Sequence, residues 1–116
     1  MHLDPPAPVA RVVRGAATRL RDALMTLSKG HADIIGHSEK SWASITFAGT
    51  RHRVELAFTG PEGIAAGECF IAFLPEHEFV LPGHLVADAA IVAVNHTLAP
   101  EPRLTVRAEL LLLDEG

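Results

Sequence analysis

The chain has 116 residues, of which 48% are hydrophobic and 21% are charged, the balance of a soluble globular domain. Its net charge of −4 lacks the basic excess of a nucleic-acid-binding domain, and its single cysteine, Cys69, excludes an internal disulfide. No apolar run approaches the roughly 20 residues that span a bilayer. We therefore expect a cytoplasmic protein that binds neither nucleic acid nor a membrane.

The charge is distributed unevenly along the chain. Residues 1–53 hold eight Lys/Arg and four Asp/Glu, whereas residues 54–116 hold two and ten. The two halves therefore attract each other, either within one folded unit or between adjoining subunits. A nucleic-acid surface on the basic half is the alternative, which the acidic total disfavours.

Residues 1–8, with three prolines, are predicted to be an extended leader, and residues 9–116 a single domain. From Val9 to Lys29 apolar residues recur every three or four positions, which predicts one long amphipathic helix that ends at Gly30. Gly15 in its interior suggests a close approach to a sheet. Three arginines share the opposite face, which is a solvated face or a site for an anionic partner: Arg11, Arg14 and Arg21.

The central feature of the sequence is a β-hairpin predicted over residues 41–60. Apolar residues occupy every second position of both arms, with Gly49-Thr50 as the turn between them. The alternating residues are Ala43, Ile45 and Phe47 in the first arm and Val54, Leu56 and Phe58 in the second. Residues 31–37 could be strand or helix, and we expect a strand that pairs with this hairpin.

Beyond the hairpin, residues 61–67 carry the glycine and proline of a loop, with one helical turn within it as the alternative. The apolar run 69–74 predicts a strand that is covered on both faces, with Cys69 as a buried thiol. Residues 87–94 could also be helical, but their β-branched side chains favour a strand. Strict alternation from Leu104 to Leu112 predicts the last strand, after a turn at residues 99–102.

These elements predict an α+β fold in which one long N-terminal helix packs on a mainly antiparallel meander of five or six strands. The layout resembles a cystatin-like or related roll, a resemblance of element order that carries no residue motif. One helix covers only part of so wide a sheet. A second copy of the chain would cover the rest, so we expect a homodimer or a higher homo-oligomer.

Four side chains in an irregular, histidine-rich segment are candidate metal ligands or an acid/base group: His77, Glu78, His84 and Asp88. Imidazole and carboxylate bind first-row divalent metals, and a histidine beside a carboxylate titrates near neutral pH. The spacing matches no standard ligand signature. A solvated loop is the favoured interpretation of Glu76, His77 and Glu78, so no cofactor is predicted and a divalent metal is the alternative.

A second set of candidates would line a ligand pocket: Trp42, His52 and His96. By strand parity His52 shares the face of Val54, Leu56 and Phe58, where it is either a core residue or one wall of a cavity. His96 would lie near it if their strands are neighbours.

No phosphate-binding loop, dinucleotide fingerprint or nucleophile elbow occurs in the sequence. The leading hypothesis is a non-enzymatic oligomeric module that binds an apolar small molecule or a protein partner. A small metal-assisted or acid/base enzyme is the second hypothesis. The third is a structural or assembly protein whose self-association is its function.

Overall fold

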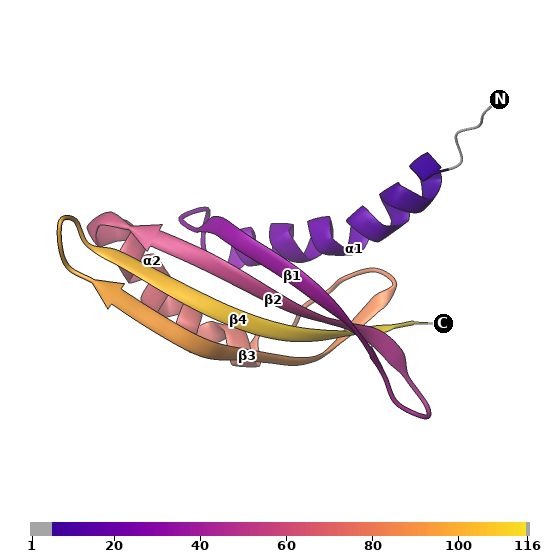
Figure 1. Ribbon diagram of the computed structural model, residues 1–116. Helices are drawn as coiled ribbons and strands as arrows, with labels where there is room; N and C mark the ends of the chain where they lie inside the picture. The colour runs from indigo at the N-terminus through magenta and orange to yellow at the C-terminus, as the bar shows by residue number, and fades with distance from the viewer. Residues whose placement is uncertain (1–5, 116) are drawn as a thin grey trace.

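The computed structural model describes residues 6–115. In chain order the elements are α1 (Pro6–Leu27), β1 (Asp33–Ala43), β2 (Ala48–Thr59), α2 (Gly60–Phe73), the 3-10 turn η1 (Leu74–Glu76), β3 (His84–Thr97) and β4 (Arg103–Asp114). The four strands form one antiparallel sheet in the order β1-β2-β4-β3, and α1 and α2 lie on one side of it (Figure 1). The α+β class and the antiparallel sheet are confirmed.

Two features of the predicted architecture are wrong in detail. The described part of the chain has two α-helices and four strands, instead of one helix and five or six strands. The sheet is also not a meander, because α2 leads from β2 to the far edge strand β3 and β4 then returns between them. Residues 33–43 and 84–97 are strands, which resolves both ambiguous segments.

The core lies between the helices and one face of the sheet. Its fully buried side chains come from α1, from the alternating positions of β2 and β4, and from α2 and η1: Leu20, Leu24, Val54, Leu56, Phe58, Phe70, Leu74, Ala108 and Leu110. The alternation of β2 and β4 placed these strand residues correctly, because a strand sends every second side chain to the same face.

The β1–β2 hairpin turns earlier than the sequence predicts. Strand pairing ends at Ala43 opposite Ala48, and residues 44–47 form the turn. The Ser44 hydroxyl accepts hydrogen bonds from the backbone N–H groups of Thr46 and Phe47, at 3.3 and 3.0 Å. This local capping by a serine fixes the turn here. Ile45 and Phe47 therefore lie in an exposed turn and not in the core.

Residues 60–73 form helix α2, so the predicted loop at 61–67 and strand at 69–74 are both wrong. Pro61 stands in the first turn, where its missing N–H costs nothing. Gly67 lies directly on the core: a Cβ there would come within 2.8 Å of the Phe58 ring and 2.7 Å of Leu104. The small residues of 60–67 therefore allow α2 to pack closely on the sheet.

The helical conformation turns Cys69 outward, and its thiol is free and exposed instead of buried. We expect a maleimide reagent to modify Cys69 in the folded protein as fast as it modifies the urea-unfolded chain, to within about tenfold. Mass spectrometry of the labelled protein measures both rates. A thiol that reacts only after unfolding would contradict this placement.

Helix α1 ends as the sequence predicts, with Gly30 at a φ of 78° and its N–H donating to the Met25 carbonyl at 2.8 Å. The close approach predicted at Gly15 is wrong, because nothing lies within 4 Å of a Cβ built there. Residues 1–5 of the predicted leader lie outside the described residues. Its residues 6–8 belong to α1, which begins at Pro6. No helix in the described range is long and apolar enough to cross a membrane.

Candidate functional site

Three side chains of types that can ligate a metal meet on the helix-covered face of β1 and β2. His37 and Glu39 are two residues apart on β1, so both point to the same face, and Glu39 is paired directly with His52 of β2. A β-bulge between Ile34 and Gly36 shifts the register so that His37 joins this face. One ligand atom from each of the three residues lies within 4.8 Å of the other two.

Hydrogen bonds connect the cluster to helix α1. The Arg21 guanidinium donates weakly to His37 Nδ1 at 3.4 Å, and His37 Nε2 lies 2.9 Å from His52 Nδ1. Because a guanidinium can only donate, His37 carries its proton on Nε2 and donates it to His52. His52 then holds its own proton on Nε2.

The environment favours the neutral form of both imidazoles, because it lowers the pKa of each. Burial lowers the pKa of His52, whose exposed fraction is 2%, and it outweighs the opposing effect of Glu39. Burial also lowers the pKa of His37, and the positive charge of Arg21 lowers it further. Neutral imidazole is the form that accepts a hydrogen bond or binds a metal.

A cavity of about 210 Å³ adjoins this cluster and contains a second histidine-carboxylate pair. Its walls include Glu39, His52, His84 and Asp114. His84 Nδ1 lies 3.5 Å from the Asp114 carboxylate, but the two are not oriented to hydrogen-bond, and this buried nitrogen has no hydrogen-bond partner. The cavity therefore combines unsatisfied imidazole nitrogen with two carboxylates.

The structure separates the four residues predicted as metal ligands. His77 and Glu78 lie in the irregular segment after η1, where the His77 ring packs edge-on against Phe79 at 4.6 Å. His84 begins β3 opposite Asp114, and Asp88 pairs with Leu111 on the other face of the sheet. These four form no group of three mutually close ligands among residues 6–115, and metal binding there stays a prediction.

Of the three pocket candidates, His52 has the predicted orientation toward the core. His96 is not its neighbour, because β4 lies between their strands. On β4, His52 pairs with Leu110 and His96 pairs with Leu104, six residues away. Trp42 pairs with Gly49 near the hairpin turn. The predicted pocket of Trp42, His52 and His96 is therefore not assembled around one point.

Sequence reasoning missed His37 and Glu39 because it misplaced the hairpin turn. A two-residue turn at Gly49-Thr50 pairs His52 with Phe47, whereas the observed turn pairs it with Glu39. The signal in the sequence is the spacing of His37 and Glu39, which places both on one face of a strand.

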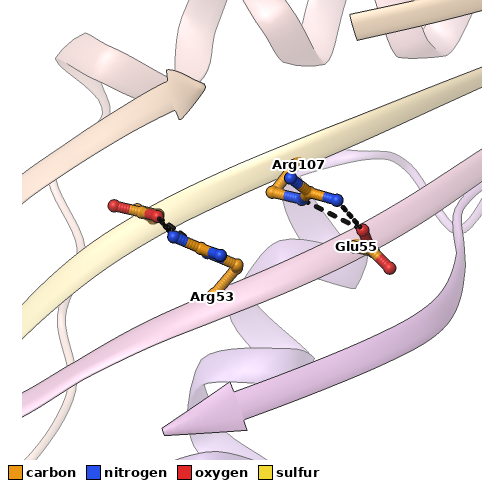
Figure 2. Close-up of polar contacts among 4 residues, drawn as sticks. Arg53, Glu55 and Arg107 are labelled. Atoms are coloured by element: carbon orange, nitrogen blue, oxygen red, sulfur yellow. Dashed lines mark hydrogen bonds and ion pairs between the residues drawn. The ribbon is translucent and has the colours of Figure 1, made fainter. Parts of the chain in front are cut away.

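The opposite face of the sheet carries charged pairs. Arg107 of β4 donates to Glu55 of β2 from Nη2 at 2.7 Å and from Nε at 3.0 Å, as Figure 2 shows. Arg53 pairs with Glu109 in the same way between the same strands. The charges of these two pairs therefore offset each other within the chain.

Both ends of the sheet carry exposed apolar side chains. The β1–β2 turn presents Ile45, fully exposed, and Phe47, 53% exposed. The β3–β4 turn, at the opposite end of the sheet in Figure 1, presents Leu98 beside a groove of about 380 Å³ that Ala99 and Pro100 help to line. The two ends thus differ in shape: one projects and the other is hollowed.

Comparisons with known proteins give a fold likeness and no family. No protein-family model and no curated protein matches the chain. A chain of the structure described as "Virion of native gene transfer agent (GTA) particle" aligns with 84% of this chain and 91% of that chain, with a TM-score of 0.56 and 11% sequence identity. At that identity the likeness is one of fold.

Proposed function

We propose that this protein is a structural subunit that functions by associating with further copies of itself in a multi-subunit particle. The observation that carries the proposal is the fold shared over 91% of a chain from a virion particle. It is the third function hypothesis drawn from the sequence, and it is now preferred to the ligand-binding module. Buried side chains fill most of the space between the helices and the sheet, and the cavity beside His52 is lined by histidines and carboxylates, which argues against an apolar ligand there.

The two ends of the sheet support an association of head-to-tail type. The exposed apolar turn at residues 44–47 and the groove at residues 97–103, which Ala99 and Pro100 line together with Thr97, Glu101 and Arg103, are different surfaces. One can therefore receive the other without two-fold symmetry. Contacts of this type close into rings or extend into filaments, whereas a homodimer uses the same surface twice. The homodimer, the cytoplasmic location and the acid/base enzyme stay predictions from the sequence.

Analytical ultracentrifugation of the purified protein over a range of concentrations tests this proposal. We expect the wild type to form species larger than a dimer. Replacing both Ile45 and Phe47 with serine removes about 1.5–3 kcal/mol of apolar burial for each side chain. The dissociation constant of the contact between two subunits should then rise by about tenfold or more for each side chain replaced.

Val80→Ser is the matched control, because Val80 is 87% exposed and lies in the segment before β3, outside both the β1–β2 turn and the groove at residues 97–103. It should assemble like the wild type. A wild type that remains monomeric at every concentration would overturn self-assembly. If the double serine variant assembles as well as the wild type, the head-to-tail contact is overturned but self-assembly is not.

A further inference from the structure

We infer that His37, Glu39 and His52 form a binding site for a first-row divalent transition metal, with zinc as the best match. The site goes beyond the proposed assembly function and does not depend on it. It rests on the placement of three side chains of suitable chemistry at one point of a rigid sheet, with a cavity beside them.

The first argument is the type and number of donors. Two imidazoles and one carboxylate are the protein ligands of zinc sites that keep a fourth position open. Purely oxygen-seeking cations such as Mg²⁺ and Ca²⁺ are disfavoured, since two of the three donors are nitrogen. The three donors come from two neighbouring strands in register, so their backbone positions are fixed by strand hydrogen bonds.

The second argument is distance. With metal–nitrogen bonds of about 2.0–2.1 Å, a tetrahedral ion holds two nitrogen ligands about 3.4 Å apart. His37 Nε2 and His52 Nδ1 are 2.9 Å apart and joined by a hydrogen bond, so a small rotation of one ring makes room for the ion between them. Glu39 is exposed, and its carboxylate can move toward the two rings without disturbing the core.

The third argument is the neighbouring cavity. It opens beside Glu39 and His52, and its volume of about 210 Å³ has room for an ion with a bound water. His84 offers a buried Nδ1 that has no hydrogen-bond partner, and Asp114 adds a second carboxylate. One of these groups, or the water, completes the coordination.

Arg21 opposes the metal in two ways. Its charge repels a cation, and its hydrogen bond holds His37 in the tautomer whose Nε2 carries the proton and cannot bind a metal. Metal binding moves that proton to Nδ1, which then faces the Arg21 guanidinium and pushes it away. Two carboxylates, Glu39 and Asp114, outnumber this single positive charge.

Titration of the chelator-treated protein with Zn²⁺ and Co²⁺ tests the site by calorimetry, by native mass spectrometry and by the visible absorption of bound Co²⁺. We expect one ion per chain and a melting temperature that rises with Zn²⁺ concentration, because the ion binds the folded state preferentially. His37→Ala should weaken binding at least about 100-fold, and Glu39→Gln about tenfold. Arg21→Gln should strengthen binding, an effect that a merely structural role of Arg21 would not produce.

His77→Ala and His96→Ala are the matched controls, since both histidines lie outside the cluster. Both should bind metal like the wild type. His52→Asn complements His37→Ala, because an alanine at the buried position 52 could unfold the domain. Absence of saturable binding in the wild type would overturn the inference, and so would binding that survives both His37→Ala and Glu39→Gln. Loss of binding in His77→Ala would place the metal in the histidine-rich loop instead.

Discussion

Replacing Phe70 with alanine is expected to lower the free energy of unfolding by about 3–5 kcal/mol, the usual cost of removing a buried phenylalanine. Phe70 is fully buried in α2, and its ring packs against the tilted ring of Phe58 in β2, with 5.7 Å between the ring centres. Its loss leaves a cavity between α2 and the sheet, lined by side chains of both layers. The Gly67 backbone lies against the same Phe58 ring and limits how far the helix can collapse into that space.

Phe73→Ala is the matched control for Phe70→Ala, in the same helix and with the same loss of atoms. Phe73 is 58% exposed, so its replacement should cost about 1 kcal/mol or less. Urea unfolding followed by circular dichroism measures both values. Equal losses at the two positions would contradict the helix, because the predicted strand at residues 69–74 buries side chains on both of its faces.

Strict alternation explains which strands could be predicted from the sequence. In β4 the buried residues Leu104, Val106 and Ala108 alternate with polar ones, and this pattern has no helical counterpart. The second arm of the hairpin, from Val54 to Phe58, has the same pattern and was placed correctly. Alternation alone therefore fixed both central strands of the sheet.

Helix α2 could not be predicted because its apolar residues do not follow a helical period. Residues 69–74 form a continuous apolar run, which suits a buried strand as well as a buried helix. Its glycines suggest a loop by local propensity, yet here they allow close packing on Phe58. Tertiary packing thus overrides the local preference, as it commonly does for small residues.

The candidate site was predicted only in part, because the sequence does not determine the register in which β1 pairs with β2. The parity of His52 depends on β2 alone and was correct, whereas its partners depend on where the hairpin turns. Gly49-Thr50 is the stronger turn signal by composition. The serine that caps residues 44–47 acts through side-chain hydrogen bonds, which composition does not reveal.

Replacing Gly49 with alanine is expected to lower the free energy of unfolding by about 1–3 kcal/mol or more, as overpacking does in a tight structure. A Cβ at this position would overlap the carbonyl oxygen of Leu112 and approach the Leu113 Cα to 2.9 Å. Both obstacles are backbone of β4 and cannot rotate away. The substitution must therefore separate β2 from β4 near Gly49. His52 lies three residues further along the same strand.

Gly15→Ala is the opposing control, because Gly15 lies within α1 with open space where its Cβ would be. Alanine there should raise the free energy of unfolding by about 0.5–1 kcal/mol, through the lower backbone entropy of the unfolded chain and a better helix propensity. Thermal unfolding of both variants measures the two changes in the free energy of unfolding, which should have opposite signs. A harmless Gly49→Ala would contradict the close approach of β2 to the β4 backbone at this position. Because β2 pairs with β4 on one edge and with β1 on the other, separating β2 from β4 would also disturb the strand that holds His52 opposite Glu39 in the proposed metal site.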